Sequence, residues 1–408
     1  MRGRRTVFFG RIALVALAAL AAVRSYGIIE VSNVTAKAIE DGKVEVLYDI
    51  ENTDGRDIWV TLEATNNDEY WVELVLVEGD VGDGVRQGYY RRIVWDAKEE
   101  WPAELFPYIR VRVRADDGQP EVPLESPDGF SFISRGSFGM GSSEAEQQLA
   151  LTSAESIDPS DEERHLVLIA QSFFLGQTEV SFAEWTETRA WALENGYTDL
   201  AVGQSGGLNS NPDTHPVTMI SWYDAVKWLN AKSERDRLDP CYLIDGEPYR
   251  VGVEVPNCDF EANGYRLPTE SEWEYACRAG SSDAFYTGDM THPDSQPLDP
   301  NLDRAAWYAG NTNDSNTRPV GDLSKEANDF GLLDLHGNVV EWCWDWYGPY
   351  KRPAMIDPVG ASSGESRVSR GGSFADGAAY CRSAYRGKTV PDLSSDRVGF
   401  RIARSANE

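Results

Sequence analysis

The stretch Gly331–Tyr347 decides the fold, and it reads Gly-Leu-Leu-Asp-Leu-His-Gly-Asn-Val-Val-Glu-Trp-Cys-Trp-Asp-Trp-Tyr. It places three tryptophans and a tyrosine around Asp334, Asn338, Glu341 and Asp345. A buried indole N–H usually needs a partner, and carboxylates are seldom buried unless they are paired or bind a metal. The stretch therefore predicts either a site for a hard metal ion or a polar hydrogen-bond network, set in an aromatic core.

Three later segments combine arginine with aromatic residues. They are Arg370-Gly-Gly-Ser-Phe374, Tyr380-Cys-Arg-Ser-Ala-Tyr-Arg386 and Val398-Gly-Phe-Arg401. Together with the first stretch, they predict one site made by chain segments that return to each other.

An ordered set of motifs extends this pattern over most of the chain. In order, the motifs are Phe138–Ser142, Gln177–Ser181, His215–Thr218, Ser221–Ala225, Tyr265–Tyr275, Arg318–Gly321, Gly337–Trp342, Arg370–Ser373 and Gly399–Arg401. The set resembles the formylglycine-generating enzyme family, also called the sulfatase-modifying factor domain, over residues 129–405. The resemblance implies an α+β, C-type-lectin-like domain that is rich in loops.

The residues themselves predict three helices in this domain. One spans Ser221–Lys232, where apolar residues recur at helical spacing. A second begins at Thr269, which forms a Thr-x-x-Glu capping box with Glu272, and it ends at Gly280. A third covers Phe182–Leu193.

Residues 28–116 read as short strands with alternating apolar and polar residues. The predicted strands are Val44–Ile50, Ile58–Ala64, Tyr70–Leu76, Arg91–Trp95 and Tyr108–Arg114. Such a series predicts an all-β sandwich domain, and it resembles a fibronectin type III or immunoglobulin-like module. Residues 117–128 are polar and rich in glycine and proline, so we interpret them as a linker. No catalytic constellation lies in the module, which serves either adhesion and positioning or simple spacing.

The N-terminus predicts export. Arg2, Arg4 and Arg5 precede the apolar run Ile12–Val23, which is too short for a comfortable membrane span. We interpret residues 1–27 as a signal peptide. The protein is then periplasmic, secreted or on the cell surface, with no stable membrane span after cleavage. An uncleaved anchor is the alternative.

The net charge and the cysteines narrow the range of partners. The formal charge of −29, without a basic stripe, disfavours nucleic acid and suits solubility and calcium. The five cysteines have no zinc spacing, and in an exported protein they can oxidise. Cys241 and Cys258 flank a short loop that a local bridge could close. The odd count leaves at least one thiol free or intermolecular.

Calcium is the first cofactor that the pattern predicts. Ca²⁺ binds about six to eight oxygens and mixes carboxylates with backbone carbonyls. By resemblance, Asp334 and Glu341 fall on the family's side-chain ligands, and Gly337 and Val339 fall on its carbonyl ligands. The family usually has asparagine where this chain has Asp334. The alternative is that Glu341 only satisfies buried amide groups.

Copper(I) is the second cofactor that the resemblance implies. The family oxidises a sulfatase cysteine to formylglycine with oxygen and a copper(I) ion held by two cysteine thiolates. Cys381 matches the second of the two thiolates, so it is a candidate catalytic residue and copper ligand. Its alternative role is a buried core cysteine or half of a disulfide. Asp376 replaces the first, and a carboxylate is a hard ligand that suits copper(I) poorly. Cys343 is a candidate replacement thiolate. Ser373 matches a serine near the family's active site, and a turn hydroxyl is its alternative role.

Two functions follow from the resemblance. One is an exported formylglycine-generating oxidase whose partner is a sulfatase polypeptide. The other is a non-catalytic, lectin-like binding or scaffold protein for another exported protein. Asp376 favours the second, and so does Val340, where the family usually has tryptophan. A related iron-dependent sulfoxide synthase needs a histidine-bearing helical domain upstream, and no histidine precedes His165.

Overall fold

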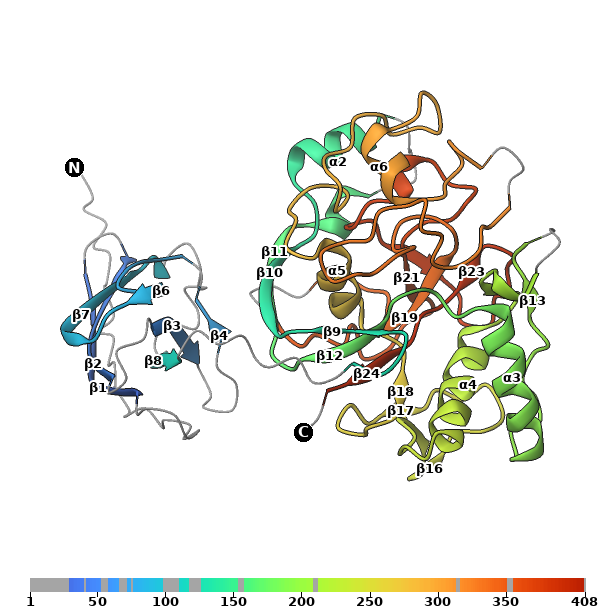
Figure 1. The fold of residues 1–408 in the computed structure, drawn as a ribbon, viewed down its shortest axis with the longest axis horizontal. Coiled ribbons are helices and arrows are strands. Elements are labelled where there is room, and N and C mark those ends of the chain that lie inside the picture. Colours follow the sequence, from blue (N-terminus) through green and yellow to red (C-terminus); the bar gives the residue numbers. More distant parts are fainter. Residues whose placement is uncertain are drawn as a thin grey trace, which may run out of the picture. The chain divides into compact units, whose positions relative to one another are not determined.

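The computed structural model describes residues 29–39, 42–52, 58–65, 72–74, 76–97, 110–116, 126–152, 158–207, 212–312, 316–350 and 355–406. The predicted signal peptide and residues 117–125 of the predicted linker lie outside these ranges. The chain divides into two compact units, Met1–Val122 and Pro123–Glu408 (Figure 1). Within the described ranges, no helix is both long enough and apolar enough to cross a bilayer.

The first unit contains antiparallel sheets. One has the strand order β1-β2-β7-β5, and the other has the order β4-β3-β6 with β8 paired to β3. The strands are β1 (Ile29–Ala38), β2 (Val44–Asn52), β3 (Ile58–Thr65), β4 (Val72–Glu73), β5 (Val77–Gly79), β6 (Gly82–Val85), β7 (Gly88–Trp95) and β8 (Arg110–Asp116). In β2, Val44, Val46, Tyr48 and Ile50 are buried at every second position, as the alternating pattern predicts.

One predicted strand of this unit differs in the structure. The sequence predicts a single strand over Tyr70–Leu76, whereas the structure has β4, which ends at Glu73, and β5, which begins at Val77. β4 pairs with β3 in one sheet, and β5 pairs with β7 in the other. Residues 70, 71 and 75 lie outside the described ranges, and within the predicted segment only Val72–Glu73 is described as strand.

The second unit is a mixed α+β domain with many loops, as predicted. Its strand orders are β10-β11-β20, β18-β24-β12-β9, β13-β14, β16-β15-β17 and β22-β21-β19-β23. The strands are β9 (Phe130–Ile133), β10 (Gly136–Met140), β11 (His165–Ile169), β12 (Phe173–Gly176), β13 (Gln204–Ser205), β14 (Val217–Thr218), β15 (Tyr242–Ile244), β16 (Glu247–Pro248), β17 (Asn257–Cys258), β18 (Tyr265–Arg266), β19 (Val340–Trp346), β20 (Met355–Ile356), β21 (Arg367–Arg370), β22 (Gly387–Thr389), β23 (Val398–Gly399) and β24 (Ala403–Ser405).

The three helices predicted from the sequence begin within one residue of their predicted starts. The α-helices are α2 (Glu144–Ala150), α3 (Phe182–Glu194), α4 (Trp222–Arg235), α5 (Glu270–Arg278) and α6 (Pro300–Ala305); the 3₁₀ turns are η3 (Pro159–Glu162), η4 (Pro212–Thr214) and η5 (Ala378–Tyr380). Thr269 caps α5 and forms the predicted capping box with Glu272. Ser221 and Asp224 form a second capping box at the start of α4. The predictions for α3, α4 and α5 are therefore confirmed.

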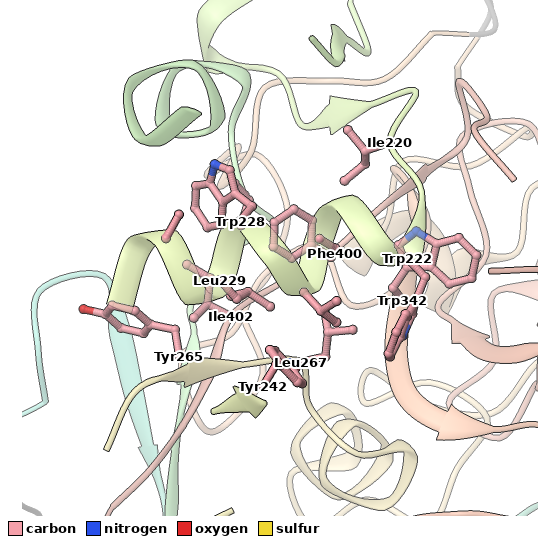
Figure 2. Close-up of a cluster of buried hydrophobic side chains, with 14 of the residues drawn as sticks. Ile220, Trp222, Trp228, Leu229, Tyr242, Tyr265, Leu267, Trp342, Phe400 and Ile402 are labelled. Atoms are coloured by element: carbon pink, nitrogen blue, oxygen red, sulfur yellow. The ribbon is translucent and has the colours of Figure 1, made fainter. Parts of the chain in front are cut away.

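The apolar face of α4 anchors the main core of the second unit. Figure 2 shows Trp222, Trp228 and Leu229 of α4 beside Phe400 and Trp342, which come from the C-terminal segments. The indole of Trp222 donates to the carbonyl of Cys343 at 2.9 Å, which ties α4 to β19. This core holds one side of β19, the strand that carries Glu341 and Asp345.

Candidate functional site

The chain segments that the sequence groups together do meet around β19. Glu341 of β19 lies opposite Arg370 of β21 and opposite Gly399 of β23. The loop before β19 contacts the loop after β21, because the amide of Gly337 donates to the carbonyl of Gly371 at 2.8 Å. The ring of His336 also donates through Nδ1 to the carbonyl of Cys381 at 2.7 Å. The prediction that these segments return to each other is confirmed.

Glu341 is fully buried and bound by two partners. Its carboxylate accepts Nε of Arg401 at 2.7 Å and Nη2 at 2.6 Å, which is a bidentate pair. The indole of Trp273 donates to the same carboxylate at 2.7 Å. Arg401 also donates to the carbonyls of Gly176 and Leu333 at 2.9 and 3.0 Å. Glu341 therefore fastens β19 to the C-terminal segment.

Two more buried carboxyl groups lie around this pair. Asp334 accepts the amide of Gly321 at 2.6 Å. Glu179 accepts Nδ2 of Asn338 at 2.6 Å and the amide of Val339 at 2.9 Å. Sequence reasoning missed Glu179 as a site residue. The signal was present, because Glu179 is the one carboxylate in the Gln177–Ser181 motif.

The charges of this cluster do not balance. Glu179, Asp334 and Glu341 are all buried, and Arg401 is the cation that faces them. Burial raises the pKa of Asp334 to about 6, although the Gly321 amide and Arg401 act in the opposite direction. Burial, with Asp334 and Glu341 nearby, raises the pKa of Glu179 well above its usual value. The cluster thus favours either proton uptake or an added cation.

The turn between Asp334 and Asn338 has a special backbone. Asp334 and Asn338 have φ angles of 61° and 53°, and Gly337 has a φ of 75°. Asp and Asn tolerate the left-handed region better than most side chains, because they can bond locally. A Cβ at Gly337 would lie 2.2 Å from the carbonyl oxygen of Trp307, so glycine is required there. The Glu179 carboxylate stabilises this turn by accepting hydrogen bonds from the Asn338 side chain and the Val339 amide.

The predicted calcium ligands lie in this turn and in the first residues of β19 that follow it. Asp334 and Glu341 could contribute carboxylates, Gly337 and Val339 could contribute carbonyls, and the excess negative charge fits a divalent cation. Among the described residues, no group of three or more His, Cys, Asp or Glu side chains is arranged to hold a metal ion. Two of the four predicted ligands are backbone carbonyls, which a search for side-chain groups does not test. The calcium site therefore stays a prediction.

Cys381 and Asp376 lie together at the position where the resemblance implies copper. Asp376 accepts the hydroxyl of Ser373 at 2.6 Å and its amide at 2.9 Å, so its carboxylate closes the turn after β21. Cys381 is fully buried, and burial together with Asp376 raises the pKa of its thiol well above the usual value. A Cβ at Gly372 would lie 2.7 Å from the Cys381 sulfur. One buried neutral thiol and one engaged carboxylate do not fit copper(I), which prefers two soft thiolates.

The structure corrects two predictions about the other cysteines. Cys343 packs in the core cluster of Trp273, whereas Cys381 packs in the cluster of Tyr308, so the structure does not bring Cys343 to Cys381. All five cysteines are free thiols, so the local bridge between Cys241 and Cys258 is absent. In the pairing of β15 with β17, Tyr242 lies opposite Cys258. Cys241 is therefore one residue out of register with Cys258.

Cys277 and His336 form a neutral pair in the core. The Cys277 sulfur lies 3.8 Å from Nε2 of His336 and 3.6 Å from the Ser383 hydroxyl. Burial raises the pKa of Cys277 to about 12 and lowers the pKa of His336 to about 3. Neither group carries charge near neutral pH, so this pair holds the fold and supplies no nucleophile.

Comparison with known proteins agrees with this geometry. The family model described as "Sulfatase-modifying factor enzyme 1-like domain" matches residues 117–406. The chaperone protein LppX of Paenibacillus barcinonensis is 30% identical over 257 residues, which cover 57% of this chain and 80% of LppX. A formylglycine-generating enzyme of Streptomyces coelicolor is 39% identical over 217 residues, which cover 50% of this chain but only 57% of that enzyme. The solved structure of Treponema denticola variable protein 1 matches with a TM-score of 0.53 and 28% identity, covering 67% of this chain and 94% of that one.

Proposed function

The chain belongs to the sulfatase-modifying factor enzyme 1-like domain family, and from this premise we propose that it is an exported, non-catalytic binding or scaffold member of that family. In this proposal, the second unit is a C-type-lectin-like domain that holds another exported polypeptide. The first unit is a β-sandwich arm, similar to a fibronectin or immunoglobulin-like module, that positions it.

The observation that carries the proposal is the turn at Asp376. Its carboxylate stands where the family's first copper thiolate is expected, and it is already engaged by the hydroxyl and amide of Ser373. The remaining thiol, Cys381, is buried and has a raised pKa. The position therefore lacks the second thiolate that a copper(I) site would need. The likeness to LppX, which is named a chaperone, supports a binding role.

Calcium belongs to the proposal as a structural ion. Asp334, Glu341 and the carbonyls of Gly337 and Val339 would hold it, and it would offset the excess charge of the carboxylate cluster. Calcium would then order the turn that separates β19 from the loop of Cys381. A polypeptide that contacts this turn would depend on calcium for binding.

A formylglycine-generating oxidase is the second candidate. The likeness to the Streptomyces coelicolor enzyme and the presence of Cys381 and Ser373 in the family's motif favour it. In that case Cys381 would be the reactive thiol, copper(I) would supply the oxygen chemistry, and a sulfatase polypeptide would be the partner.

A peptide oxidation assay separates the two candidates. The mature protein, loaded with copper(I) under air, is mixed with a peptide carrying Cys-x-Pro-x-Arg, and mass spectrometry follows the conversion of thiol to aldehyde. We expect no aldehyde from the natural chain and gain of copper(I) binding in Asp376→Cys, which supplies a second thiol. Asp376→Asn is the matched control, because it keeps a turn acceptor without a thiol. Aldehyde from the natural chain, lost in Cys381→Ser, would establish the oxidase instead.

A further inference from the structure

More than half of the exposed large apolar side chains in the described part of the second unit come from three short segments, residues 199–203, 250–256 and 390–394. Val202 and Val253 are each 68% exposed, so most of each residue is open to solvent. Exposed apolar residues are ordinary when they are scattered, whereas a group of them marks an interaction site. The group is called the apolar patch below, and it consists of Val202, Val251, Val253, Val255, Val390 and Leu393.

The first two segments are tied to each other and to α4. Asp199 accepts the amide of Gly252 at 2.7 Å and Nζ of Lys227 at 2.8 Å. Lys227 lies in α4, and it also donates to the carbonyl of Gly252 at 3.1 Å. Val253 follows Gly252 directly, so this part of the apolar patch is held beside α4.

The first turn of α4 holds the other segments. Asp224 accepts the amide of Ala201 at 3.0 Å, which fixes the first segment. The amide of Trp222 donates to the carbonyl of Pro391 at 2.9 Å, which fixes the third. Each of these anchored residues is a neighbour in sequence of a member of the apolar patch. Side chains from all three segments therefore lie around the start of α4.

The charges beside the apolar patch are mainly negative. Glu254, Asp392 and Asp396 are exposed carboxylates in or next to the same segments. Burial raises the pKa of Tyr223 in α4, and the charges of Asp392 and Glu254 raise it further, so both carboxylates lie near this ring. Arg397 is an exposed cation that offsets one of these charges. The surface thus combines apolar side chains with an excess of negative charge.

We propose that the apolar patch binds a polypeptide segment that carries apolar side chains together with lysine or arginine. Its apolar side chains would leave water against the valines, and its basic side chains would face the carboxylates. A second copy of this chain would bring the same carboxylates against each other, so charge disfavours self-association. The patch serves the proposed binding function, on which this inference rests, and gives that function a surface and a partner chemistry.

A library of random peptides displayed on phage is the probe for the first test. The full chain, free of copper, selects peptides, and fluorescence anisotropy measures their affinities. We expect the selected peptides to combine apolar with basic residues, and to bind Val253→Ser and Leu393→Ser at least about tenfold more weakly than the natural chain. Both positions are exposed, so these variants should fold.

Leu323→Ser is the matched control, and it should bind the selected peptides as the natural chain does. Leu323 is 88% exposed, and its loop is tied to α6, away from α4, by the ion pair of Arg304 with Glu326 (Figure 1). No enrichment of peptides, or equal affinities for the natural chain and both patch variants, would overturn the proposal.

Charge variants test the chemistry of the partner. Glu254→Gln and Asp392→Asn keep the shape of each side chain and remove its charge. We expect both variants to bind the selected peptides more weakly and with less dependence on salt. Asp329→Asn is the control, because Asp329 is also exposed but lies in the loop of Leu323. Unchanged affinity and salt dependence in both charge variants would contradict a basic partner.

Two further measurements test other occupants of the apolar patch. A dimer in sedimentation that is lost in Val253→Ser would assign the patch to a second copy. Binding to phosphatidylcholine vesicles that is lost in the same variant would assign it to a lipid surface. Either result would overturn the proposal.

Failure of the patch differs from failure of the proposed function. Equal peptide affinities in the natural chain and the patch variants would remove the patch and leave binding to another surface. Aldehyde in the peptide oxidation assay would instead remove the non-catalytic function itself.

Discussion

Arg401 connects three distant parts of the second unit through one guanidinium. It pairs with Glu341 in β19 and donates to the carbonyls of Gly176 and Leu333. All of these contacts are buried, so water cannot replace them when the side chain is removed. A buried ion pair adds little net stability over an apolar pair, but breaking one half leaves an uncompensated charge.

We therefore predict that Arg401→Met destabilises the second unit by about 3–5 kcal/mol, because Glu341 loses its counter-charge beside Glu179 and Asp334. Urea unfolding measures the loss. The matched control is Arg304→Met, whose ion pair with Glu326 is half exposed, with side-chain exposures of 50% and 52%. That variant should lose about 0–1 kcal/mol. Equal losses in both variants would contradict the importance assigned to the buried pair.

Asp334 gives a pH prediction. Its pKa is about 6 in the folded chain, against an ordinary value of 3.8. The folded state then holds the proton more tightly than the unfolded state, so stability falls as pH rises from about 4 to about 6. The difference in pKa corresponds to up to about 3 kcal/mol. In a chelator, urea unfolding should show this fall in the natural chain and a smaller fall in Asp334→Asn.

Calcium should reverse that loss. At pH 7, added calcium should raise the stability of the natural chain, because it favours ionised Asp334, and it should do little for Asp334→Asn. Calorimetry checks binding directly. Stability profiles that coincide for the two chains, with and without calcium, would remove both the raised pKa and the calcium site.

At the scale of elements, α5 contacts both β19 and β21 through its side chains. Its capping box joins the Thr269 hydroxyl to the Glu272 amide at 3.1 Å and the Glu272 carboxylate to the Thr269 amide at 2.8 Å. Further along the helix, Trp273 donates to Glu341, and Glu274 pairs with Arg278 and Arg370. The start of the helix thus positions side chains that reach β19 and β21.

Thr269→Ala should cost about 0.5–2 kcal/mol, because the first-turn amide of Glu272 loses its acceptor in a buried place. Thr269→Ser keeps the hydroxyl and should recover most of this loss. Thr186→Ala is the control, since Thr186 is exposed in the middle of α3 and its loss should stay within about 0.5 kcal/mol. Thermal unfolding compares the three variants; a loss in Thr269→Ser as large as in Thr269→Ala would point to packing rather than to the cap.

At the scale of the whole molecule, the chain has two units with separate cores. The family match at residues 117–406 coincides with the second unit, Pro123–Glu408. The predicted calcium ligands and the Cys381 turn are made by residues of this unit.

A chain that begins at residue 123 should therefore fold alone. We expect its melting temperature to stay within a few degrees of the matching transition in the full chain, because each unit has its own buried core. Scanning calorimetry of both chains measures this. A drop of more than about 10 °C, or loss of a cooperative transition, would mean that the first unit stabilises the second.

The sequence alone determined the local elements and the family. Helical spacing of apolar residues located α4, the capping box at Thr269 located α5, and alternation located β2 and β3, because these signals act between residues a few positions apart. The ordered motifs also identified the segments that meet at β19. That β4 and β5 belong to different sheets was not predictable, because the same alternating pattern suits either sheet.

Only the tertiary structure decided which groups within those segments face each other. Glu179 reaches Asn338 across 159 residues, Arg401 is the partner of Glu341, and Cys343 and Cys381 pack in different clusters. The physical reason is that such contacts arise from packing of the whole core. Local spacing restricts which face a side chain occupies, but it does not specify the distant residue on the other side.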